Sequence, residues 1–383
     1  MWSYNTLVVL AGAASLGLLC ALVGTFAVLR RQALLGDALA HATLPGLCLA
    51  FLWLGIKHPL AMPVGAFATG LLGVAAVVAL RHGGRLRPDA ALGVVLSVFY
   101  GAGVVLSRVV QNQTTTGSKA GLERFLLGSA AGMVVQDVVL ISLLALAVAV
   151  VIGLGYRAWK VMSFDASFAL ALGLPVSWLD GVLMALVALT VVAGLPAAGA
   201  VMVAALLVLP VVSARLWVQR LETLLVLACL LGVAMGSTGV LLSAAVERLP
   251  TGPTIVLVGG AIFLVSLLAS PQRGLVVRLL RLARFRRQLA LFQLLQTLSE
   301  LHQERSSVPV EISQLAERLG WPPARTAARV LQARVHRWVT QPQPHLAELT
   351  PEGRARLREL EQQLAADWGA WLDAAPDREG AAR

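Results

Sequence analysis

The chain has 383 residues, of which 58% are apolar and only 13% are charged. Globular domains carry roughly 25% charged residues, so this composition excludes an ordinary soluble protein. The formal net charge is +11, and the excess falls beside apolar segments, so it indicates membrane-flanking charge rather than a nucleic-acid surface. The sequence therefore predicts an all-α, polytopic membrane protein.

Apolar segments that are long enough to cross a membrane as helices recur through the first 270 residues. We expect nine of them, near residues 7–29, 33–55, 60–80, 90–107, 136–156, 178–196, 198–214, 222–243 and 252–270. The number ranges from eight to ten, because segment 108–135 is ambiguous and the turn at 196–198 is very short. We assign residues 1–270 to a transmembrane domain.

Basic residues mark every second connection between these segments. They occur at 30–31, 81–87, 157–160, Arg215 with Arg220, and in the arginine-rich stretch 271–287. Since basic loops face the cytoplasm, the pattern predicts an outside N-terminus, nine crossings and a cytoplasmic C-terminus. The insert 161–177 then faces the cytoplasm and reads as a short surface helix that ends at Gly173-x-Pro175. Such a helix suits docking to a cytoplasmic partner, or it is an interfacial helix that only caps the bundle.

Asp37 and His41 lie in an apolar stretch, LLGDALAHATLPGLCLAF (34–51). Their spacing places both side chains on one helix face, about 6 Å apart along the axis. A carboxylate at mid-membrane costs ~2.5–3.5 kcal/mol on insertion scales unless it is paired or hydrated. One interpretation places Asp37 near the cytoplasmic end of its span, where it caps the helix and pairs with Arg30 or Arg31.

The other interpretation of Asp37 and His41 is a cation site. Carboxylate oxygen and imidazole nitrogen suit Zn²⁺, Mn²⁺ and Fe²⁺. Two ligands do not complete a coordination shell, but a symmetric dimer would supply four around a shared axis. His58 and His82, at the ends of spans, are better explained as interfacial residues. Pro45 and Gly46 predict a local bend that turns the ligands toward a pore.

Four segments carry a resemblance to a known family: GDALAHATLPGLCLAF (36–51), FDASFALALGLPV (164–176), GAVMVAALLVLPVVSARL (199–216) and PTGPTIVLV (250–258). They resemble the permease subunits of bacterial zinc/manganese/iron ABC importers over residues 1–270. The resemblance implies a multi-pass permease of the bacterial cytoplasmic (inner) membrane that pairs with a second copy or a paralogous permease. It also implies a metal pathway lined by Asp37 and His41, with no permanently bound cofactor beyond the transported ion.

The same resemblance implies two protein partners besides the membrane lipids. Segment 164–176 resembles the cytoplasmic coupling segment of these permeases, and a cytoplasmic ATP-binding subunit would dock on it through Phe164, Asp165, Phe168 and Gly173. An extracytoplasmic metal-binding receptor would deliver the ion. The sequence lacks a G-x-x-x-x-G-K-[ST] phosphate loop, so ATP hydrolysis is expected on a partner chain and this chain is not itself an enzyme. A metal-chelate permease of the siderophore or cobalamin type remains the alternative. Nothing in the sequence ranks the three metals.

Residues 288–383 form a second predicted domain, which follows the basic juxtamembrane segment 271–287. The pattern predicts an amphipathic helix, a helix, a turn at Gly320, a second helix, a hairpin-like segment and a closing helix that begins at Thr350. This order resembles a small α+β winged-helix domain. His302, His336 and His345 show no tight metal-ligand spacing, which argues against a metal sensor.

The second helix of this predicted domain carries arginines without an acid: Arg325, Arg329, Arg334 and Arg337. They are candidates for contact with DNA, which would make the chain a membrane-tethered, metal-responsive regulator. The same spacing is ordinary for a solvated helix face, and the tail as a whole is nearly neutral. We therefore expect a regulatory or assembly role rather than nucleic-acid binding.

Overall fold

The computed structural model describes residues 4–54, 61–81, 88–113, 132–246, 249–271, 274–304 and 309–374. The chain forms two compact units, Met1–Leu275 and Val276–Arg383, and each is described by itself. His58 and His82, and most of the ambiguous segment 108–135, lie outside the described residues.

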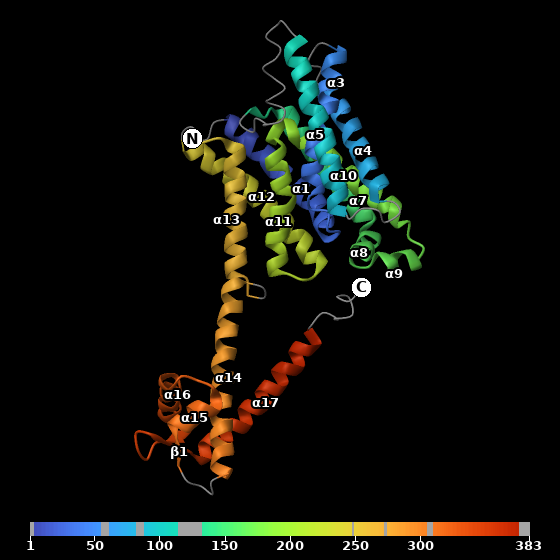
Figure 1. The fold of residues 1–383 in the computed structure, drawn as a ribbon. Helices are drawn as coiled ribbons and strands as arrows, with labels where there is room; N and C mark the ends of the chain where they lie inside the picture. The colour runs from blue at the N-terminus through green and yellow to red at the C-terminus, as the bar shows by residue number, and fades with distance from the viewer. Residues whose placement is uncertain are drawn as a thin grey trace. The chain divides into compact units, whose positions relative to one another are not determined.

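Nine helices of the described residues are long and apolar enough to cross a membrane, which confirms the expected number. They alternate in direction through the first unit (Figure 1). These spans are α1 (Tyr4–Leu29), α2 with α3 (Leu35–Ala42 and Leu44–Leu54), α4 (Ala61–Arg81), α5 (Pro88–Gln113), α7 (Val135–Leu154), α10 (Val176–Ala198), α11 (Ala200–Trp217), α12 (Leu221–Ala245) and α13 (Thr251–Ala269).

Helix α1 is the central element of the membrane unit, because it packs against α7, α10, α11 and α12. Its closest approach to α12 is at two glycines: a Cβ added to Gly232 would lie 2.4 Å from the carbonyl oxygen of Gly17. Small residues at such crossings let helix backbones touch, which is how membrane helices gain packing energy without a hydrophobic driving force between them.

We expect Gly232→Ala to destabilise the membrane unit, because the added methyl group must displace the backbone of α1. Overpacking of this kind costs ~1–3 kcal/mol. Thermal unfolding of the purified protein in detergent measures the effect. Gly260→Ala is the matched control, since a Cβ at that position meets nothing within 4 Å. An unfolding temperature for Gly232→Ala equal to that of the control would contradict the packing argument.

The second span is interrupted at Thr43, between α2 and α3. Pro45 has no N–H, so the carbonyl of His41 lacks its usual i+4 donor. The two halves also pack into different cores: Leu35, Leu39 and their neighbours join the main core around α1, whereas Leu44, Phe51 and their neighbours join a smaller core with α4, α5 and α10. The predicted bend is therefore a boundary between two packed regions.

The insert between α7 and α10 forms two short helices, α8 (Tyr156–Phe164) and α9 (Ala166–Ala171), where the sequence suggested one. They are separated at Asp165, whose backbone is extended and whose carboxylate accepts a hydrogen bond from the Phe168 amide at 2.9 Å. This N-cap starts α9. At the other end Gly173 has φ +77°, a left-handed conformation that suits glycine and stops the helix.

The second unit follows the element order expected for the tail: α14 (Leu275–Glu304), β1 (Val310–Glu311), α15 (Ile312–Leu319), α16 (Pro323–Val335), β2 (Val339–Thr340), β3 (Leu346–Leu349) and α17 (Pro351–Ala374). The strands form an antiparallel sheet in the order β1-β3-β2, with Val310 opposite Ala347 and Val339 opposite Leu349. The unit has its own hydrophobic core. Helix α14 runs through most of the basic segment 271–287, which is therefore largely helical.

Candidate metal site and coupling surface

Asp37 and His41 face each other on α2, in its first and last turns. Asp37 Oδ1 lies 3.7 Å from His41 Nε2. A carboxylate near a helix N-terminus is favoured by the helix dipole. The negative end of the helix dipole at the C-terminus of α2 also favours a bound cation.

The pair lies deep in the membrane unit rather than at its mouth. The ring of His41 packs edge-on against Tyr100, with ring centroids 4.8 Å apart, and Tyr100 is midway along α5. On the other side, a Cβ at Gly70 or Gly73 in the middle of α4 would contact Thr43 or Ala42. The end of α2 therefore sits at mid-depth, which the sequence left open.

The ligand geometry suits one shared ion. With metal–ligand distances of ~2.0–2.2 Å, two donors in a tetrahedral shell lie roughly 3.4 Å apart, close to the observed 3.7 Å. The Nδ1 atom of His41 is buried and has no hydrogen-bond partner among the described residues. The suggested partner of Asp37, Arg30, pairs with Asp180 instead. Within the described residues, the ion pair that Asp37 makes is the one with His41.

The described part of one chain does not supply a complete set of metal ligands. The described residues contain no group of three or more His, Cys, Asp or Glu side chains that could hold a metal. Yet the side chains of Asp37 and His41 are 50% and 30% exposed at the surface of the chain. Beside them, α5 presents an exposed row of small residues, Gly93, Ser97 and Gly101, one helical turn apart.

The predicted coupling residues divide into two kinds. Asp165 and Gly173 shape the segment, as its N-cap and its left-handed stop. Phe164 and Phe168 are 65% and 55% exposed, although they are aromatic. Hydrogen bonds from the Phe168 amide and then the Ser167 hydroxyl lower the pKa of Asp165, so the cap stays ionised at neutral pH. The segment thus presents a fixed apolar surface.

Helix α8 is anchored to the bundle by two contacts that the sequence did not indicate. Trp159 is buried and its ring lies 5.8 Å from that of Phe26 on α1. Lys160 Nζ donates to Glu222 on α12 at 2.6 Å, and this carboxylate raises the pKa of Lys160. Figure 1 shows α8 and α9 together at one end of the membrane unit, drawn in green.

The four arginines of the tail do not form one row. Arg325 and Arg329 are a turn apart on α16, Arg334 falls on the opposite flank, and Arg337 lies beyond the helix with φ 60°. The outermost face of α16 carries exposed apolar residues: Ala324, Ala328, Leu331 and Val335. These cannot donate or accept hydrogen bonds at base edges. Contact of the arginines with DNA stays the less favoured alternative, and a regulatory or assembly role stays the prediction.

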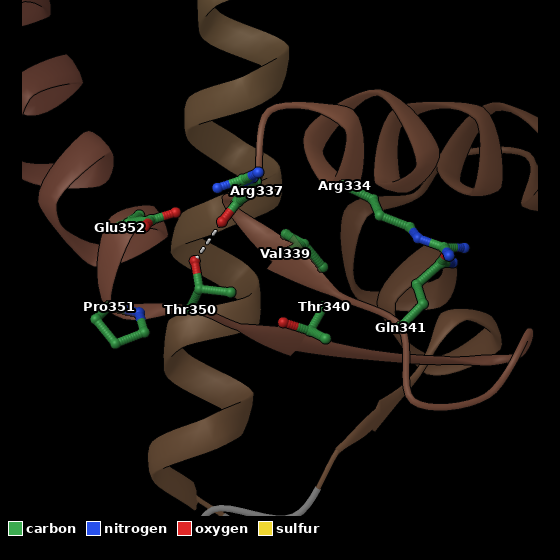
Figure 2. Close-up of a pocket in the computed structure, with 8 residues that line it drawn as sticks. All are labelled: Arg334, Arg337, Val339, Thr340, Gln341, Thr350, Pro351 and Glu352. Atoms are coloured by element: carbon green, nitrogen blue, oxygen red, sulfur yellow. Dashed lines mark hydrogen bonds between the residues drawn. The ribbon is translucent and has the colours of Figure 1, made fainter.

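A groove of about 400 Å³ lies between the end of α16 and the start of α17. Figure 2 shows Arg334 beside Gln341, and the Thr350 hydroxyl hydrogen-bonded to the Arg337 carbonyl at 2.7 Å. The same Thr350 oxygen accepts from the Gly353 amide at 2.9 Å, which caps α17. These contacts account for the predicted helix start at Thr350. They also join the residue that follows β3 to the residue Arg337, which lies just after α16.

Comparison with known proteins gives a consistent set of relatives. The model of a family described as the ABC 3 transport family matches residues 3–270. A zinc transport system membrane protein, TroC of Treponema pallidum, is 41% identical over 285 residues, 74% of this chain and 94% of that protein. A manganese transport system membrane protein, MntC of Bacillus subtilis, is 38% identical over 79% of this chain and 69% of its own length.

A solved structure, PsaBC from Streptococcus pneumoniae in complex with Fab, contains a chain with a similar fold. The similarity has a TM-score of 0.63 at 27% identity, and it covers 73% of this chain and 96% of that one. The family match falls on the membrane unit, where Asp37, His41 and the coupling segment lie.

Proposed function

This chain belongs to the ABC 3 transport family, and from that premise we propose that it is the permease subunit of an importer that moves a divalent transition-metal ion. The ion would be Mn²⁺, Zn²⁺ or Fe²⁺, and the membrane the bacterial cytoplasmic membrane. The observation that carries the proposal is the Asp37–His41 pair: two metal-type donors 3.7 Å apart, at mid-depth, with an unsatisfied imidazole nitrogen.

The exposure of this pair supports a dimeric pathway. A half-exposed carboxylate at mid-depth would be costly against lipid, so the face that carries it must meet water or protein. The small residues Gly93, Ser97 and Gly101 on the neighbouring α5 permit close approach of another helix. We therefore propose that a second permease, identical or paralogous, covers this face and contributes its own aspartate and histidine to the ion.

ATP hydrolysis is assigned to a separate cytoplasmic subunit that docks on α8 and α9. The exposed Phe164 and Phe168 support this docking, since aromatic side chains are enriched in the cores of protein interfaces. With α8 and α9 on the cytoplasmic side, helix alternation puts the chain's C-terminus in the cytoplasm and its N-terminus outside. An extracytoplasmic receptor would deliver the ion to the outer face.

Reconstitution tests the proposal directly. The permease and its ATPase, purified together and placed in proteoliposomes with the receptor protein, should accumulate radioactive Mn²⁺, Zn²⁺ or Fe²⁺ only when ATP is present. Competition among the three ions then identifies the preferred metal. Accumulation of an iron–siderophore complex or cobalamin, with no uptake of free ions, would instead support the metal-chelate alternative, for which the Asp37–His41 pair is dispensable.

A further inference from the structure

Arg30 contacts two other elements from the turn that leads into α2. Its Nε donates to Asp180 Oδ1 at 3.0 Å, and its Nη2 donates to the other oxygen of the same carboxylate. Its Nη1 donates to the main-chain carbonyl of Met162 at 3.1 Å. The side chains of Arg30 and Asp180 are only 14% and 21% exposed. One guanidinium group therefore joins α1, α8 and α10.

The Met162 carbonyl belongs to the last turn of α8, where carbonyl groups have no amide donor within the helix. Arg30 supplies that donor, so it fixes the end of α8 two residues before the exposed Phe164. Asp180 lies near the start of α10, the helix that follows directly after α9. Arg30 thus holds the end of α8 and links it to the start of α10, the helix that follows α9.

The route from Arg30 to the metal pair is short and stiff. Arg31 adopts φ 57°, and the amides of Arg31 and Gln32 bond back to the Val28 and Ala27 carbonyls at 3.1 and 2.8 Å. This is the Schellman arrangement that closes a helix. The Leu35 amide then donates to the Gln32 carbonyl at 3.0 Å, where α2 begins. Hydrogen bonds thus span the turn, which leaves little slack to absorb a displacement of Arg30.

We propose that Arg30 and Asp180 are a positioning pair that transmits movement of the coupling segment to α2, and hence to Asp37 and His41. This inference rests on the proposed function, because it requires an ATPase on α8 and α9 and a metal ion on α2. ATP-driven displacement of α8 pulls on the Met162 carbonyl, and the bidentate ion pair makes α1, α10 and the turn before α2 respond together. Neither residue touches the ion.

The test measures two rates in one preparation. Full-length permease carrying Arg30→Ala, Arg30→Lys or Asp180→Asn is reconstituted with its ATPase, and metal uptake and ATP hydrolysis are recorded together. Arg30→Ala and Asp180→Asn should lower uptake on the order of tenfold, within the range for residues that modulate coupling, while hydrolysis stays within about twofold. Arg30→Lys should be intermediate, because an ammonium group lacks the fork that bonds both partners.

Lys160→Ala is the matched control, since it breaks another ion pair of α8, to Glu222, that does not lead to α2. It should leave the ratio of ions moved to ATP hydrolysed unchanged. A parallel fall of uptake and hydrolysis in the Arg30 and Asp180 variants would show a merely structural role and overturn the inference, as would unchanged uptake. Absence of ion uptake in the unaltered protein would contradict the proposed function instead. If Arg30→Ala does not fold, Arg30→Lys and Asp180→Asn decide the question.

Discussion

Replacement of Asp37 or His41 by alanine is expected to reduce metal uptake to background while the protein still inserts into the membrane. Structural zinc sites gain about 10–16 kcal/mol from four ligands, so one ligand accounts for roughly 3 kcal/mol, or ~100-fold in occupancy. In a two-fold symmetric site each substitution removes two ligands at once. Uptake of radioactive metal into cells or proteoliposomes gives the readout, with protein amount in the membrane measured alongside.

Thr69→Ala is a suitable control for these variants. Thr69 lies on α4, and within the described residues its hydroxyl donates to backbone carbonyls, those of Gly65 and Ala66 at 3.2 Å and Thr43 at 3.5 Å. It lies close to the end of α2 without offering a metal-type donor there. Normal uptake in both Asp37→Ala and His41→Ala would refute the metal assignment. Loss of uptake that is equal in Thr69→Ala would attribute the effect to packing around α2 rather than to ligation.

The double variant Phe164→Glu with Phe168→Glu should abolish assembly with the ATPase. Two exposed aromatic side chains on a rigid helix pair are typical interface anchors, and an anchor of this kind contributes about 2 kcal/mol or more, ~30-fold in affinity. Placing a carboxylate in a desolvated interface adds a further cost. Co-purification of the two subunits, followed by ATP-dependent uptake, measures the loss.

Val246→Glu serves as the matched change for the coupling variant. Val246 is 47% exposed and follows α12 at the end of the bundle opposite to α8 and α9. The substitution therefore introduces a carboxylate away from the proposed docking surface. The ATPase should co-purify with this control as it does with the unaltered chain. Retention of the ATPase by the double phenylalanine variant would place the docking surface elsewhere.

Much of the membrane unit could be predicted from the sequence, because each span must satisfy its backbone internally and cover itself with apolar side chains. The same logic located Asp37 and His41, since ionisable residues are rare in such segments. The helix spacing i, i+4 was enough to place both side chains on one face of α2, where the structure has them 3.7 Å apart.

The rest of the site depended on contacts between segments far apart in the chain. Tyr100 comes from α5, fifty-nine positions after His41, and nothing in its local sequence marks it as a neighbour. Arg30 looked like ordinary membrane-flanking charge, and only the packing of α1, α8 and α10 shows that its partners are Asp180 and Met162. In the tail, the count of arginines on α16 concealed that they point to different flanks.

Local strain is concentrated in the short segment 31–45. Arg31 adopts a left-handed conformation, which costs a non-glycine residue ~1–2 kcal/mol. Asp37 places a carboxylate at mid-depth, His41 has an unsatisfied nitrogen, and Pro45 interrupts the hydrogen-bond ladder. Prolines interrupt the ladder in other described spans too, at Pro196 in α10 and Pro210 in α11, but there they are not combined with an ionisable pair. Where local preferences conflict with the fold, the free-energy gap between the native geometry and alternative geometries is smallest. Helix α2 is therefore the part of the membrane unit whose native geometry is easiest to exchange for another.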